Sequence, residues 1–172
     1  MYLSCYLAQF KQGWSHTSMY ILRDRSDESG NQTFGFYQTN YQPRLAAHYL
    51  HNMTHILADK GSATNLKKLN YSIPNCPNTV HDLLLQKKDG TLMLVVWGEK
   101  YVSGATADNI TVQFDRNFKT INVYNPAQYS AGDPKTGERP VAAYNDVSSI
   151  PLTILNTPFI IEIKYNTKTR ST

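Results

Sequence analysis

The hydrophobic pattern of the chain is densest in residues 81–97, where two apolar runs flank a short polar segment. The runs are residues 83–85 and 92–97, and Asp89-Gly90 lies between them. An Asp-Gly pair between strand-like runs predicts a β-hairpin with a type I′ turn, because both central residues of that turn need positive φ. The apolar residues are consecutive and do not alternate, which predicts that both strands are covered on both faces.

The N-terminal part of the chain has a different pattern, in which helical spacing predominates. Apolar residues spaced by three and four predict a helix over residues 2–12, with Gly13 as a natural stop. A second helix is predicted from Pro43 to Gly61, because proline is tolerated in the first turn of a helix. Between the helices, residues 16–22 and 34–37 predict two short strands.

From residue 63 onward the pattern is that of strands separated by turns. Besides the hairpin, strands are predicted at 69–73, 109–114, 120–124, 140–144, 149–155 and 159–165. About eight strands at this regular short spacing are typical of an antiparallel β-sandwich. We therefore expect a mainly β fold, divided into a helix–strand–helix segment (1–62), the sandwich (63–165) and a flexible tail (166–172).

The lone strand predicted at residues 16–22 needs a neighbour, because its backbone groups must find hydrogen-bond partners. It would add to a sandwich sheet, pair with residues 34–37, or pair across a dimer. A homo-oligomer formed through the N-terminal segment is therefore one of three expected arrangements.

Composition indicates a folded globular chain, with 41% hydrophobic and 17% charged residues. The formal charge is +4, but the basic residues are scattered and form no run that would track a phosphate backbone, so nucleic acid is not an expected partner. No apolar run approaches the roughly 20 residues of a membrane span, and residues 1–12 show no signal peptide. Cys5 and Cys76 leave both a disulfide and two free thiols open.

Four stretches carry a family resemblance: FKQGWSHTSMYILRD (10–24), FGFYQTNYQPRLAAHYLHNMTHIL (34–57), HDLLLQKKDGTLMLVVW (81–97) and SSIPLTILNTPFIIEI (148–163). Together they resemble the C-terminal part of a bacterial-type glycoside hydrolase with a (β/α)8 barrel and a C-terminal β-sandwich. The resemblance implies that the first two stretches correspond to the last barrel strand and helix. It also implies an extracellular or secreted protein that contacts polysaccharide.

The resemblance does not extend to a catalytic site. Retaining glycoside hydrolysis needs two carboxylates about 5–5.5 Å apart, and in enzymes of this type both would lie upstream of Met1. None of the 13 acidic residues matches either carboxylate, so we expect no hydrolytic activity and no cofactor. Three functions stay open: a non-catalytic accessory module that binds carbohydrate, a structural or protein-interaction domain, and a hydrolase fragment that needs the barrel for activity.

Exposed aromatic residues are the candidates for carbohydrate contact, because a flat ring suits the C–H face of a sugar. Loop aromatics are the better candidates, since loops carry binding residues more often than cores do. The candidates are Tyr101, Tyr129, Trp14 and Tyr41. The alternative is that these rings pack in the core and rim of the sandwich.

A loop rich in oxygen donors is the first metal candidate, with Asp24, Asp27, Glu28 and Asn31 as its donors. Such loops can hold Ca²⁺, but the spacing is not that of an EF-hand. Arg23 and Arg25 would oppose a cation, so a solvated loop is the preferred interpretation.

The second metal candidate is a histidine stripe on the predicted second helix, formed by His48, His51 and His55. Two imidazoles four residues apart can share a Zn²⁺ ion. Because no cysteine or carboxylate lies nearby in the sequence, we expect these histidines to be the solvated face of an amphipathic helix, without a metal.

Overall fold

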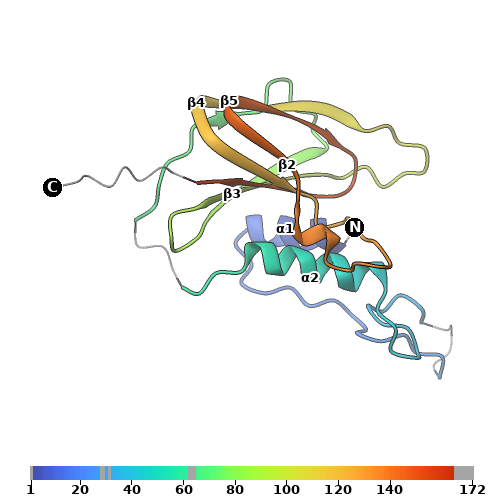
Figure 1. The fold of residues 1–172 in the computed structure, drawn as a ribbon. Helices are drawn as coiled ribbons and strands as arrows, with labels where there is room; N and C mark the ends of the chain where they lie inside the picture. The colour runs from blue at the N-terminus through green and yellow to red at the C-terminus, as the bar shows by residue number, and fades with distance from the viewer. Residues whose placement is uncertain (1, 28–29, 31, 62–64, 165–172) are drawn as a thin grey trace.

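Two helices packed on one six-stranded antiparallel sheet make up the fold (Figure 1). The computed structural model describes residues 2–27, 30, 32–61 and 65–164. The elements are α1 (Tyr2–Lys11), α2 (Leu45–Leu57), β1 (Tyr71–Ser72), β2 (Val80–Gln86), β3 (Leu92–Gly98), β4 (Asp108–Tyr124), the 3-10 helix η1 (Thr136–Glu138), β5 (Pro140–Ile154) and β6 (Phe159–Ile163). The predicted mainly β fold with a small helical part is confirmed. The predicted tail, 166–172, lies outside the described residues.

The sheet curls so that its two ends form layers. Its strand order is β1-β4-β6-β3-β2, and β5 pairs along β4. The β4–β5 ladder shifts register between Gln113 and Phe118. In Figure 1, β4 and β5 lie above β2 and β3, and the helices lie below. A buried apolar core that includes Leu94, Ile121 and Ile150 fills the space that the curled sheet encloses.

Strand β3 is buried along its whole length, as the consecutive apolar residues predict. Its side chains point alternately into two apolar cores. Leu92, Leu94 and Val96 enter the core of the curled sheet, whereas Met93, Val95 and Trp97 face the helices. The same prediction is wrong for β2, which is an edge strand and only half-buried beyond Val80.

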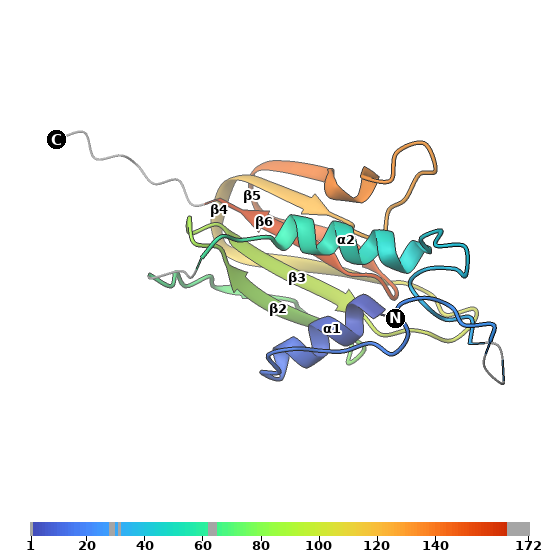
Figure 2. The ribbon, with the colours of Figure 1, turned by 90° about the horizontal axis from the view of Figure 1, so that it is seen from below.

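The helices cover one face of the sheet through a second apolar cluster. Leu3 and Leu7 of α1 and Met53 and Ile56 of α2 pack with Trp97 in this cluster. Figure 2 shows both helices lying across this face, with α1 beside β2 and β3. The predicted helices are thus present, but α2 begins at Leu45 after an Arg44 N-cap.

Several predicted short strands are continuous in the structure. Residues 109–114 and 120–124 both belong to β4, and residues 140–144 and 149–155 belong to β5 except for residue 155. The polar residues between each pair interrupt the alternation in sequence. The two strands nevertheless continue, because they pair with each other on both sides of an irregularity in the ladder, close to which Asp146 has a φ of 53°.

The strands predicted at residues 16–22 and 34–37 are absent from the structure, and this prediction is wrong. Among the described residues, this segment makes isolated bridges such as Arg23–Tyr37, outside the sheet. Ile21 has a φ of 65°, which is a rare conformation for a β-branched residue and cannot continue a strand. The apolar pattern alone therefore does not produce a strand where no sheet edge is adjacent.

The predicted hairpin is present, but its turn is not type I′. Gly90 has a φ of 85°, whereas Asp89 is not among the residues with positive φ. The Lys87 amide donates to the Thr91 carbonyl at 2.9 Å, and the Gly90 amide donates to the Lys87 carbonyl at 2.8 Å. This is the three-residue loop in which a type I turn is followed by a left-handed glycine.

We predict that Gly90→Ala lowers the free energy of unfolding by about 1–2 kcal/mol, because alanine is strained in the left-handed region. Gly132→Ala is the matched control, because Gly132 has no positive φ and a Cβ there meets nothing within 4 Å. Urea unfolding of both variants checks the prediction. Equal stability of the two variants would contradict the turn assignment.

Candidate functional site

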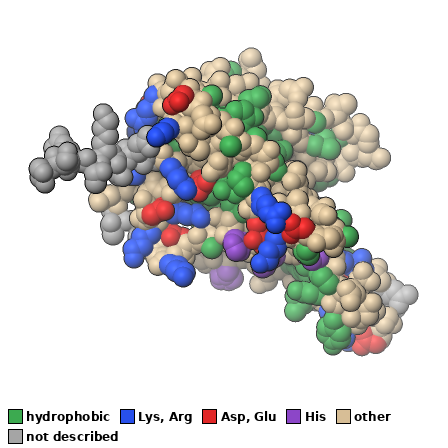
Figure 3. Space-filling view, viewed as in Figure 1, with side chains coloured by type: hydrophobic (Ala, Val, Ile, Leu, Met, Phe, Trp, Pro, Cys, Tyr) green, Lys and Arg blue, Asp and Glu red, His purple; other side chains and the backbone are tan. Residues whose placement is uncertain are grey.

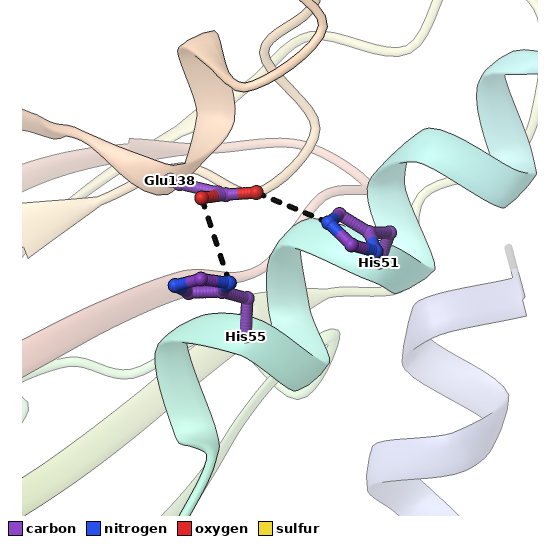
Figure 4. Close-up of side chains that lie close together, drawn as sticks. All are labelled: His51, His55 and Glu138. Atoms are coloured by element: carbon purple, nitrogen blue, oxygen red, sulfur yellow. Dashed lines mark ion pairs between the residues drawn. The ribbon is translucent and has the colours of Figure 1, made fainter.

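Two histidines of α2 and one glutamate of η1 converge at the surface (Figure 4). His51 Nε2 lies 3.2 Å from Glu138 Oε1, and His55 Nδ1 lies 3.6 Å from Glu138 Oε2. One ligand atom from each of the three residues lies within 4.8 Å of the others. Within the described part of the chain, no other group of three histidine, cysteine or acidic residues is gathered closely enough to hold a metal ion. We call this group the His2Glu cluster.

Close packing of η1 on α2 places the glutamate over the histidines. Gly137 is buried, and a Cβ at this position would lie 2.4 Å from Asn52 Nδ2 and 2.8 Å from the Gln128 carbonyl oxygen. Asn52 is fully buried and donates to the Pro126 carbonyl at 3.0 Å. Only glycine fits this approach, so its neighbour Glu138 is carried to the histidine stripe.

The three side chains differ strongly in exposure. The His51 and His55 side chains are 63% and 60% exposed, whereas that of Glu138 is 11% exposed. Among the described groups, the buried Oε1 of Glu138 has no hydrogen-bond partner, although His51 Nε2 lies close to it. A buried carboxylate oxygen without a hydrogen bond is unusual and calls for a cation or an ordered water.

The expectation that the histidine stripe has no carboxylate near it is therefore wrong. Glu138 is far from α2 in the sequence, and no local pattern pairs the two. His48, the third histidine of the stripe, does not belong to the cluster. Its ring packs against Tyr129, with the ring centroids 4.6 Å apart.

The oxygen-rich loop is held together by arginines. Asp24 is buried, pairs with Arg44, and accepts a hydrogen bond of 2.8 Å from the Gly35 amide. The hydrogen bonds from Arg44 and from Gly35 hold the pKa of Asp24 below its usual range. Asp27 is exposed and pairs with Arg25 at 2.9 Å, which also lowers its pKa. Glu28 and Asn31 lie outside the described residues.

The aromatic candidates for carbohydrate contact are distributed over the molecule. Tyr129 packs on His48, and the Tyr41 ring lies 4.7 Å from the Arg23 guanidinium carbon. Tyr101 lies beside Ser4 in the first turn of α1. Trp14 follows the last turn of the same helix and lines a groove of about 370 Å³ with Phe10 and Leu83, among other residues.

The outer side of the N-terminal segment exposes large hydrophobic side chains. Among them are Tyr20, Leu22 and Phe34, whose exposed fractions are 72%, 69% and 50%. The Tyr20 and Phe34 rings are 6.4 Å apart. Leu22 also lines a groove of about 420 Å³ that includes Phe36 and Leu50. Figure 3 shows hydrophobic atoms gathered at the lower right, where Figure 1 places this segment.

Cys5 and Cys76 are both free thiols in the structure, Cys76 being exposed. None of the described helices combines the length and the hydropathy that a membrane span requires. No protein-family model matches the chain, and no curated protein matches its sequence.

We predict that acid loosens the segment that Asp24 holds. The folded-state pKa of Asp24 lies below the ordinary value of about 3.9. The ionised carboxylate therefore stabilises the fold fully when the pH is above the ordinary value. This stabilisation is lost as the pH falls through the folded-state pKa. We expect the Gly35 amide, which donates to Asp24, to exchange with solvent faster once the carboxylate is protonated. Amide exchange followed by NMR, corrected for the intrinsic pH dependence, checks this.

Asp24→Asn should show the same loosening at pH 7, with Gly35 exchange faster by about tenfold or more, because a hydrogen bond to a charged group is lost. Asp27→Asn is the control, since Asp27 is exposed and makes no contact with Gly35 among the hydrogen bonds described. Unchanged exchange in Asp24→Asn would show that the carboxylate does not anchor the segment.

Proposed function

We propose that this chain is a non-catalytic module that docks on a folded protein partner through its N-terminal segment. The partner we favour is the barrel part of a glycoside hydrolase of the type that the sequence resembles. The observation that carries the proposal is the docking surface, Tyr20, Leu22 and Phe34, which is apolar and exposed. Contiguous exposed apolar side chains on a soluble domain mark interaction sites more often than scattered single ones do.

The docking surface lies on a fixed scaffold, which supports a role in recognition. Asp24 ties the segment to Gly35 and to Arg44, the N-cap of α2. A Cβ at Gly35 would lie 2.7 Å from the Asp24 amide nitrogen, so the backbone at Gly35 packs closely against that at Asp24. Apolar side chains that are already held in place lose less conformational entropy on binding.

The backbone of the same segment supports a barrel as the partner. Residues 16–22 belong to no strand of the sheet, although the Leu22 carbonyl accepts from the Tyr37 amide at 3.0 Å. A strand of the partner beside them would offer hydrogen-bond partners to their other backbone groups. In the family that the sequence resembles, this stretch corresponds to the last barrel strand, whose neighbours belong to the barrel.

We predict that the chain forms a 1:1 complex with a separately produced glycoside hydrolase barrel in sedimentation velocity. The double variant Tyr20→Ser/Leu22→Ser should weaken this complex at least tenfold, because it removes two exposed apolar anchors. Leu66→Ser is the matched control, because Leu66 is 82% exposed and lies outside the segment. A dimer of the chain alone that the double variant abolishes would assign the docking surface to a second copy. No association of either kind would overturn the proposal.

Carbohydrate binding is the second candidate function, favoured by Trp14. This ring is 60% exposed and lines an apolar groove that also includes His16 and Thr17, a combination of stacking face and polar groups that suits a sugar. We predict that electrophoresis in polysaccharide gels retards the chain and that Trp14→Ala removes the retardation. Tyr41→Ala, whose ring contacts Arg23, should keep it. Migration independent of polysaccharide would exclude this function.

A further inference from the structure

We propose that His51, His55 and Glu138 form a binding site for one zinc ion, with a fourth coordination position open to solvent. Two imidazole nitrogens and one carboxylate are a set of protein ligands that zinc accepts, and sites with three protein ligands leave the fourth position to water or to a ligand. The site is built from α2 and η1 and shares no residue with the docking surface, although His51 and Leu22 line the same groove.

The donor atoms lie close enough to converge on one tetrahedral ion. Zinc–nitrogen and zinc–oxygen bonds of 2.0–2.2 Å place neighbouring ligand atoms about 3.3–3.6 Å apart. The separations are 3.2 Å from His51 Nε2 to Glu138 Oε1 and 3.6 Å from His55 Nδ1 to Glu138 Oε2, and one ligand atom of each residue lies within 4.8 Å of the others. Both histidines are exposed, so their rings are free to make the small rotation that brings all three donors onto one ion.

The electrostatics of the cluster also favour a cation. The Glu138 side chain is only 11% exposed, and its buried Oε1 has no hydrogen-bond partner among the described groups. A divalent ion at the cluster would supply the partner that this buried oxygen lacks. Figure 4 shows the Glu138 carboxylate facing both rings, so an ion held between the three side chains would contact all three residues.

The fold fixes the two halves of the site independently of any metal. His51 and His55 are four residues apart on α2, which places both on one helix face. The Glu138 backbone is fixed by the close approach of Gly137 to Asn52 and by the hydrogen bond from Asn52 to Pro126. A site that is already assembled does not spend binding free energy on ordering its ligands.

The donor set selects a borderline transition metal over the hard cations. Ca²⁺ and Mg²⁺ require six or more oxygen ligands, and the cluster offers one carboxylate. Imidazole suits zinc and its neighbours. We therefore expect zinc to bind and magnesium not to compete at millimolar concentration.

The test is isothermal titration of the untagged full chain with zinc chloride at pH 7.5. We expect 1:1 binding, with an affinity that falls at least tenfold in His51→Ala, in His55→Ala and in Glu138→Gln. His48→Ala is the matched control, because His48 lies one turn earlier on α2 and packs on Tyr129, and it should bind as the unaltered chain does.

Three results would overturn the proposal. The first is no saturable binding to the unaltered chain at millimolar zinc, a readout that needs no variant to fold. The second is equal binding by the unaltered chain and all three ligand variants. The third is loss of binding in Cys76→Ser alone, which would assign the zinc to the exposed thiol. Circular dichroism of each variant shows whether it is folded, and Glu138→Gln preserves the shape of the glutamate side chain.

Discussion

The burial of strand β3 on both faces is the constraint on which the rest of the structure depends. Its even-numbered side chains fill the core of the curled sheet, and its odd-numbered side chains need a second cover. Leaving Met93, Val95 and Trp97 in water would forfeit about 1.5–3 kcal/mol for each side chain. The two helices are therefore required parts of this fold, and the N-terminal segment is anchored to the sheet through them.

This packing also determines where the polar groups of the helical layer lie. Helix α2 turns Met53 and Ile56 toward the sheet, so the opposite stripe of histidines must face outward. The connection between β4 and β5 returns across the same helix, where buried Asn52 and Gly137 meet. Gly137 permits this close packing and thereby fixes the position of Glu138, the next residue in the chain.

The sequence pattern predicts well those features that depend on neighbours along the chain. The two helices, the hairpin and the burial of β3 follow from spacing, turn residues and consecutive apolar positions. The continuity of β4 and β5 does not, because it depends on pairing between the two strands on both sides of an irregularity in their ladder. The strand predicted at residues 16–22 is absent because no sheet edge lies beside this apolar run, so it gains no ladder hydrogen bonds. The sequence pattern could not assign Glu138 to the cluster, because Glu138 meets α2 only through a tertiary contact.

The central place of β6 in the sheet has a consequence for how the chain folds. This last strand pairs with both β3 and β4, joining Leu92 to Ile163 and Ile121 to the same residue. Until it arrives, β3 and β4 each present an open, strongly apolar edge. Contacts between residues so distant in sequence slow folding, and open edges promote aggregation while they last. The sheet therefore stays divided during folding until β6 pairs with both of its neighbours.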